Sequence, residues 1–250
     1  MEICQRELPI KPWLQAKTRR LPGIQPVATG EWLLRDDAFA AQMAYRDRLI
    51  AEQESDVFKA TPESLPMQEE LLETVLSELD GDHRKGRRPD GVRVPLNGPP
   101  LLVAARLVQE DLLIMDMARE PKLTAGVLCF PASWSLAEKF GAGLMAIHGY
   151  VDEYTDEMAL RVRRMFDAIR PEQPLWRANF LRYAEADLHQ PRRNGEARPA
   201  PASGGFVRVE RQTLRKLPRT GAVVFGIHTY VIRWDQLNSA EQSAFIEASA

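Results

Sequence analysis

The last third of the chain has the strongest alternation of apolar and polar positions. Residues 206–217, FVRVERQTLRKL, follow the period of two that is typical of a β-strand. One face of this strand carries Phe206, Arg208, Glu210, Gln212 and Leu214. The turn sequence Pro-Arg-Thr-Gly at 218–221 predicts a hairpin, and residues 222–234, AVVFGIHTYVIRW, return as a second long strand.

Helical periodicity dominates the first half. One helix is predicted to begin at Asp36 or Asp37 and to end near residue 53, and a second is predicted over 61–79, where Thr61 can cap it. Further predicted elements are a short helix over 100–108, a strand over 110–117, a long helix over 156–169, a strand over 175–183 and a short helix from Asn238 or Ser239. Helices interleaved with a mostly antiparallel sheet are typical of the α+β class.

The segment 82–99, DHRKGRRPDGVRVPLNGP, is the best candidate for a domain boundary. Basic residues, glycines and prolines crowd there without periodicity. We therefore expect an N-terminal arm and helical extension over 1–95 and a larger domain over 96–250. A solvated loop is favoured over a partner-docking patch, since most charge runs are solvated. His83 is expected to be exposed in this loop.

The central stretch 126–154 leads to a single histidine. A buried strand is predicted over 127–130, followed by a short helix that Ser133 would cap. A second apolar run then precedes His148. On this pattern alone a hydrogen-bonded structural histidine is the more common outcome. The alternative is a haem ligand, which needs a neutral, rigidly held imidazole and apolar walls, one of which Met145 could supply.

Composition narrows the classes of function. The net charge of −2 gives no reason to expect nucleic acid or an anionic membrane as a partner. Cys4 and Cys129 form neither a disulfide framework nor a zinc pattern, and no apolar run is long enough for a spanning helix. We therefore expect a soluble, cytoplasmic protein. Motifs for nucleotide binding, for a nucleophile elbow, for a zinc protease and for covalent haem are absent from the sequence.

Glu210 is the best-placed carboxylate for chemistry, because its strand face also carries apolar residues. If that face is inward, the carboxylate is buried and must be paired or kept neutral, and both situations are common at active sites. A salt bridge to a nearby arginine is the alternative, and the spacing alone favours it. Four arginines could pair with haem propionates or with an acidic surface of a partner: Arg208, Arg211, Arg215 and Arg219. His228 is expected to have a cross-strand or surface role.

Three segments together resemble the α-subunit family of haem-dependent oxidative N-demethylases. They are LCFPASWSLAEKFGAGLMAIHGYVDEY at 128–154, LWRANFLRY at 175–183 and RVERQTLRKLPRTGAVVFGIHTYV at 208–231. The resemblance spans about residues 21–234. It implies a PAS-like domain that holds b-type haem, with His148 as the proximal iron ligand and Glu210 as a polar residue near the bound substrate.

The resemblance also implies a reaction and its partners. A small secondary amine, dimethylamine, would be oxidised with O₂ to methylamine and formaldehyde. Electrons would come from NADPH through separate reductase subunits that carry flavin and an iron–sulfur cluster, which agrees with the lack of flavin and nucleotide motifs in this chain. A second hypothesis is a PAS-type haem or small-ligand sensor without turnover. A Soret band that shifts on adding dimethylamine favours the enzyme, whereas a response to O₂, CO or NO alone favours the sensor.

Overall fold

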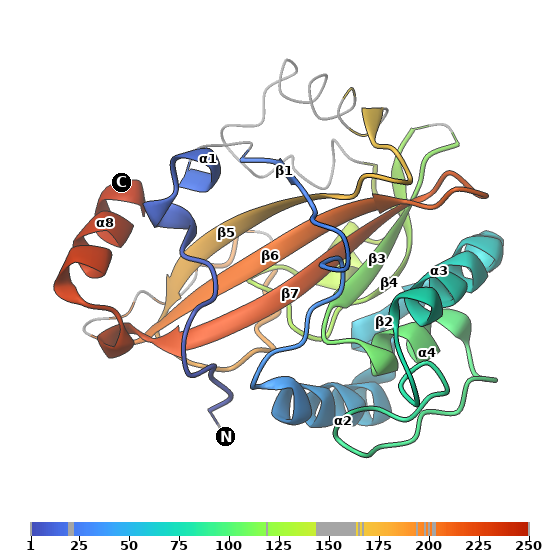
Figure 1. Cartoon of the computed structure of the whole chain (residues 1–250), viewed down its shortest axis with the longest axis horizontal. Coiled ribbons are helices and arrows are strands. Elements are labelled where there is room, and N and C mark those ends of the chain that lie inside the picture. Colours follow the sequence, from blue (N-terminus) through green and yellow to red (C-terminus); the bar gives the residue numbers. More distant parts are fainter. Residues whose placement is uncertain are drawn as a thin grey trace.

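The chain folds around one antiparallel sheet. The computed structural model describes residues 2–19, 23–118, 120–143, 164, 166, 168–193, 195–197, 199, 201 and 204–249. Within these residues, seven strands form the sheet in the order β1-β5-β6-β7-β3-β4-β2 (Figure 1). Helices flank the sheet, so the α+β class predicted from the sequence is confirmed, and the arrangement is consistent with a PAS-like fold.

The long central strands lie where the alternation predicts them. The strands are β1 (Gln25–Pro26), β2 (Phe58–Ala60), β3 (Asp111–Asp116), β4 (Lys122–Val127), β5 (Leu175–Tyr183), β6 (Phe206–Lys216) and β7 (Val223–Arg233). The α-helices are α1 (Ala16–Arg19), α2 (Phe39–Val57), α3 (Leu65–Glu78), α4 (Pro100–Leu107), α5 (Leu136–Lys139) and α8 (Ser239–Ser249). The 3₁₀-helices are η1 (Pro12–Leu14), η2 (Pro62–Ser64) and η3 (Trp234–Gln236).

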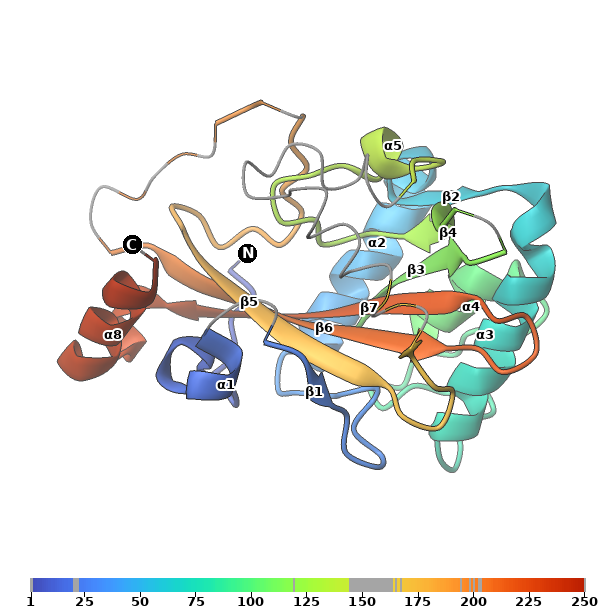
Figure 2. The same cartoon turned by 90° about the horizontal axis from the view of Figure 1, so that it is seen from above.

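The two faces of the sheet are covered by different parts of the chain. Residues directly opposite each other in an antiparallel pair lie on the same face, so Glu210 shares its face with Asn179 of β5 and Thr229 of β7. This Glu210 face looks toward α5, whereas the N-terminal arm with α1 lies on the other side of the sheet (Figure 2). On that other side, Trp13 packs edge-on against Phe245 of α8, with 5.0 Å between ring centroids.

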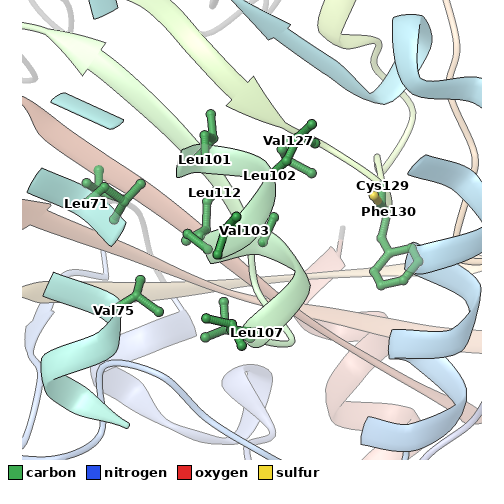
Figure 3. Packing of buried hydrophobic residues seen from close by; sticks show 14 of the residues in the cluster. Leu71, Val75, Leu101, Leu102, Val103, Leu107, Leu112, Val127, Cys129 and Phe130 are labelled. Atoms are coloured by element: carbon green, nitrogen blue, oxygen red, sulfur yellow. The ribbon is translucent and has the colours of Figure 1, made fainter. Parts of the chain in front are cut away.

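Helices α3 and α4 close one end of the sheet with an apolar core. Leu71 and Val75 of α3, Leu101 and Leu107 of α4 and Leu112 of β3 are completely buried in one cluster (Figure 3). Each fully buried leucine contributes on the order of 1.5–3 kcal/mol relative to an exposed one. The helix α4 therefore belongs to the interior, and it follows the predicted bounds of 100–108 to within one residue.

Residues from both sides of the predicted domain boundary share the sheet. Strand β1 pairs with β5, and β2 pairs with β4, so two strands from residues 1–95 form its two edges. The division into 1–95 and 96–250 remains a prediction. None of the helices in the described ranges combines the length and the apolar character that crossing a membrane would require.

The strand predicted over 127–130 is wrong, because the strand in this region ends where the predicted one begins. Strand β4 ends at Val127, and the following residues are buried but not in the ladder. The reason is Asp111, whose carboxylate accepts the backbone N–H groups of Cys129 at 2.9 Å and Phe130 at 2.8 Å. A buried side chain thus replaces the neighbouring strand as the hydrogen-bond partner, which satisfies these backbone donors outside the sheet.

The predicted cap of the next helix is also wrong. Helix α5 begins after Ser135, not after Ser133. Ser133 has φ of 65°, its backbone N–H donates to the carbonyl of Gln190 at 3.1 Å, and its hydroxyl lies 3.2 Å from that of Tyr183. Its side chain is therefore engaged across the fold instead of at a helix terminus. At α2, likewise, Asp36 accepts the N–H of Ala38 at 2.8 Å but is not itself the cap.

The loop at 82–99 is only partly solvated. Arg88 is buried and pairs with Asp47 at 2.9 Å and with Asp90 at 2.6 Å. His83, expected to be exposed, is half-buried, and its Nε2 lies 2.7 Å from the carbonyl oxygen of Leu107. These long-range partners make the loop part of the packed structure, which its composition did not indicate. Most of the long helix predicted over 156–169 lies outside the described residues.

Candidate functional site

Glu210 lies inside the sheet, on β6 between β5 and β7, and its side chain is buried. Its Oε1 accepts a hydrogen bond from Arg208 at 3.1 Å, and its Oε2 accepts one from Asn179 at 3.1 Å and one from Gln212 at 3.2 Å. The burial expected for an inward face and the alternative of an arginine salt bridge are therefore both confirmed. We call Glu210, Arg208, Asn179 and Gln212 the Glu210 cluster.

The acceptor positions of this carboxylate are not all used. A carboxylate offers about four acceptor positions, two on each oxygen. The three donors of the Glu210 cluster occupy both positions of Oε2 and one of Oε1. Among the described residues, this leaves room at Oε1 for one further donor, which could be the N–H group of a bound ligand.

Arg208 connects the Glu210 cluster by hydrogen bonds to the segments that follow β4 and β5. Its Nη1 donates to the carbonyl of Leu188 at 2.9 Å, and its Nη2 donates to the carbonyl of Phe130 as well as to Glu210. Close by, Nδ1 of His189 lies 2.8 Å from the carbonyl oxygen of Cys129. One buried guanidinium thus fixes the chain after β4, the chain after β5 and the carboxylate of Glu210 relative to one another.

Arg177 lies beside the cluster on β5, opposite Gln212. Its Nε is buried without a hydrogen-bond partner, and no hydrogen bond or ion pair of its side chain is found among the described residues. Burial lowers the pKa of Arg177, and the nearby charge of Glu210 offsets part of that effect. The residue as a whole is half-buried, and a charge that is partly withdrawn from water is costly when no partner offsets the lost hydration.

Apolar side chains continue the Glu210 face beyond the cluster. Ile227 of β7 lies opposite Gln212, and Leu214 follows along β6. They belong to a buried cluster whose other members come from the chain on the α5 side and from strands β3, β4 and β7: Leu113, Met115, Leu123, Leu128, Leu136, Phe166, Ile169 and Val223. The described part of this face therefore combines apolar walls with one carboxylate and two guanidinium groups.

The other predicted haem contacts are distributed over the molecule. His148 and Met145 lie outside the described residues. Arg211 is on the opposite face from Glu210, where its Nη2 donates to the carbonyl of Glu31 at 2.6 Å. Arg219, in the hairpin turn, is largely exposed and pairs with Glu73 at 2.6 Å. The structure does not bring Arg211 and Arg219 together with Glu210, and their roles toward haem remain predictions.

The sequence did not predict that His228 is a buried charged group. Expected to have a cross-strand or surface role, it is completely buried, with Nδ1 3.0 Å from Glu110 and Nε2 3.1 Å from Asp36. Burial alone would lower the pKa of His228, but hydrogen bonds and charge from the two carboxylates raise it to about 9. Its partners are 118 and 192 residues away in sequence, so no local pattern could reveal them.

A separate hollow of about 520 Å³ lies where α2, β2 and α5 meet. It is lined by Ser55, Phe58, Lys59, Ala60, Ala137 and Phe140. None of these residues is on β5, β6 or β7, so this hollow does not include the Glu210 cluster. Its lining offers no buried carboxylate or arginine, and we do not assign chemistry to it.

The Glu210 face fits a haem in two respects. The apolar residues can pack against a macrocycle, and the orphaned Nε of Arg177 is a donor of the kind that binds propionates. Among the described residues, no group of three or more histidine, cysteine, aspartate or glutamate side chains is arranged to hold a metal ion. The iron ligand predicted from the sequence, His148, lies outside these residues.

The fold and this site define an α+β protein with a PAS-like sheet and a buried, partly unsatisfied polar cluster on one covered face. A family model described as haem-dependent oxidative N-demethylase, alpha subunit-like, matches residues 23–248. The chain belongs to this family, which confirms the resemblance recognised in the sequence. The family description implies a haem cofactor, an oxidative N-demethylase activity and a complex of several subunits.

Proposed function

We propose that this chain binds b-type haem and oxidatively removes a methyl group from a small secondary amine such as dimethylamine, giving methylamine and formaldehyde. The observation that carries the proposal is Glu210, a buried carboxylate with one acceptor position left on an otherwise largely apolar face. Membership of the family supports the same reaction class. Haem, when bound, would supply the activation of O₂ that this oxidation needs.

Glu210 would bind and orient the amine. Dimethylamine is a strong base and arrives largely as a cation at neutral pH, and a cation on an apolar face is costly unless a carboxylate meets it. The free position at Oε1 can accept one N–H of the ammonium group, while Arg208, Asn179 and Gln212 hold the carboxylate in place. Glu210 could also accept a proton from the amine as general base.

Further roles follow from the sequence. We propose that His148 would hold the haem iron and that Met145 would form part of the apolar wall. Arg211 and Arg219 stay candidates for propionate contacts, although their present partners Glu31 and Glu73 would have to be exchanged.

Reduction of the iron requires other polypeptides. We propose that electrons come from NADPH through reductase subunits that carry flavin and an iron–sulfur cluster, in line with the α-subunit description of the family. We also propose a cytoplasmic location, which the free thiols of Cys4 and Cys129 support because disulfides are rare there.

Haem binding through His148 is the first prediction to test. The protein is expressed with a haem precursor, and the Soret absorbance per protein is measured. His148→Ala should lose most of the haem, whereas the control variants His83→Ala and His189→Ala should keep it, since these two histidines contact backbone carbonyls. Full haem occupancy in His148→Ala would reject the assignment.

The same spectrum separates the enzyme from a sensor. A Soret band that shifts when dimethylamine is added supports substrate binding beside the haem. If the band responds only to O₂, CO or NO, the chain is a PAS-type haem sensor without turnover. Formaldehyde formation with a matching reductase and NADPH then gives the direct assay of the proposed activity.

A further inference from the structure

The arginines that are buried in the described part of this protein have hydrogen-bonded partners, whereas the half-buried Arg177 has no such partner there. Arg46 pairs with Asp111 at 2.7 Å, and Arg208 pairs with Glu210 at 3.1 Å. The buried Arg88 and Arg211 are likewise satisfied, by carboxylates and by backbone carbonyls. Arg177 alone has a buried Nε and no hydrogen bond or ion pair among the described residues.

The position of Arg177 makes the missing partner informative. It faces the same side of the sheet as Glu210, two residue pairs along the β5–β6 ladder. Glu210 takes its three hydrogen bonds from other residues, so it acts on Arg177 only through its nearby charge. Within the described residues, the site therefore presents an acceptor with one free position next to a guanidinium that has no hydrogen-bonded carboxylate.

We propose that Arg177 binds a carboxylate that a ligand brings to the Glu210 face. A planar guanidinium can hold a carboxylate through two parallel hydrogen bonds, which gives orientation as well as affinity. The carboxylate is either a haem propionate or part of the substrate, and in both cases the inference rests on the proposed function. In the second case the substrate class changes from simple amines to N-methylated amino acids, with the amine at Glu210 and the carboxylate at Arg177.

A half-buried cation without a hydrogen-bonded partner among the described residues has a measurable consequence in the haem-free protein. Its removal in Arg177→Gln should leave the melting temperature unchanged or raise it, because the desolvation cost of the charge disappears. The matched control is Arg182→Gln on the same strand but the other face, where the guanidinium stacks 4.1 Å from the Trp234 ring and donates to Gly204 at 2.6 Å. That control should lower the melting temperature, and a purely structural role for Arg177 predicts the same fall for Arg177→Gln.

Two pairs of ligands identify the source of the carboxylate. Haem is compared with haem dimethyl ester, which lacks both carboxylates, and N-methylglycine is compared with dimethylamine, with dissociation constants taken from absorbance titrations. If a propionate binds Arg177, Arg177→Gln should cut the preference for haem over its ester by on the order of 10-fold to 100-fold. If the substrate supplies the carboxylate, the preference for N-methylglycine over dimethylamine should fall by the same order. Arg177→Lys, which keeps the charge but loses the planar fork, should fall between wild type and Arg177→Gln.

The outcomes separate the inference from the proposed function. If wild type and Arg177→Gln have the same preference in both pairs, the inference about Arg177 is overturned while haem binding stands. If the chain binds neither haem nor its ester, the proposed function fails. Arg177 is then tested with N-methylglycine in the haem-free protein. N-methylglycine must raise the melting temperature of the wild type but not that of Arg177→Gln. The inference is overturned if it does not.

Discussion

At the scale of single residues, the carboxylate of Glu210 is the group with the most specific surroundings. Three side chains donate hydrogen bonds to it, and the charge of a fourth, Arg177, lies near it without a hydrogen bond. Because the donors are an arginine and two amides, they can hold the carboxylate in one orientation. The amides of Asn179 and Gln212 can also turn their oxygens toward the site if the residue at 210 becomes neutral.

The change Glu210→Gln should therefore separate turnover from folding. It keeps the shape of the side chain and removes its charge, so haem content should stay near wild type. Amine affinity should fall, and formaldehyde formation per haem should drop on the order of 10²-fold, the usual scale for losing one acid–base group. Haem occupancy, melting temperature and formaldehyde per haem are measured on the same preparation.

Glu110→Gln provides the matched control, because Glu110 is an equally buried glutamate that contacts His228 away from the Glu210 face. This control should lower the melting temperature and leave turnover per haem unchanged. Our assignment of Glu210 is incorrect if Glu210→Gln behaves in the same way as Glu110→Gln.

The sequence could group Glu210 with its neighbours on β6 but not with those on β5. The period of two puts every second residue of β6 on one face, so Arg208, Glu210 and Gln212 can be grouped from the sequence alone. Asn179 comes from β5, 31 residues away, and joins the group only through the strand register. The lack of a partner for Arg177 among the described residues is a property of the packed structure, and no pattern in LWRANFLRY indicates it.

At the scale of elements, the β6–β7 hairpin fixes the register on which the Glu210 cluster depends. Its turn closes through Leu217, whose N–H donates to Ala222 at 2.8 Å and whose carbonyl accepts from Gly221 at 3.0 Å. Glu70 of α3 accepts the backbone N–H groups of Arg219 at 2.6 Å and Thr220 at 2.8 Å. Burial would raise the pKa of Glu70, but these hydrogen bonds outweigh it and the pKa is lowered.

We expect glycine to be required at position 221 because of its backbone conformation, and not because a side chain would lack room. Its φ is 73°, and a Cβ added there would meet no atom within 4 Å. Gly221→Val forces a β-branched residue into the left-handed region, which costs about 1–2 kcal/mol and should lower the melting temperature by roughly 2–8 °C. Gly221→Asn should cost less, because asparagine tolerates this region. Equal melting temperatures for wild type and Gly221→Val would show that glycine is not required.

Elements with their own periodicity were predictable, whereas the connections were not. Strands β5, β6 and β7 and helix α4 agree with the predicted ranges because alternation and apolar runs are local signals. The end of β4 depends on Asp111, which captures the next backbone donors and is itself held by Arg46 of α2. Such side-chain-to-backbone bonds join segments far apart in sequence, and only the folded structure reveals them.

At the scale of the whole molecule, the N-terminal arm is fastened to the sheet at His228. Gln5 exchanges hydrogen bonds with the backbone of Val231 on β7, and its side chain also donates to Asp36 at 2.8 Å. Asp36 lies before α2, and Glu110 lies just before β3. His228 contacts both carboxylates, so one imidazole connects the arm, the start of α2 and two strands of the sheet.

This arrangement makes stability depend on pH in a defined direction. The folded pKa of His228 is raised to about 9, above the value of about 6.5 for an unfolded histidine. The folded state thus binds the proton more tightly, and the stabilisation is present in full below pH about 6.5 and is lost as pH rises through about 9. Burial lowers the pKa of His83, so His83 titrates below this window.

The free energy of unfolding should therefore fall by about 2 kcal/mol between pH 6.5 and 8.5, which denaturant titrations at each pH can measure. An unfolded cysteine begins to ionise only near the upper end of this window, whereas burial raises the pKa of Cys129 in the folded protein to about 12. Ionisation of this thiol on unfolding therefore contributes little to the change in the free energy of unfolding. In His228→Gln the group that titrates is gone, so the variant should be less stable at pH 6.5 and its stability should change little up to pH 8.5. If the wild type shows the same flat dependence as His228→Gln, then His228 does not hold its proton between Asp36 and Glu110, and the fastening of the arm by a charged imidazole is wrong.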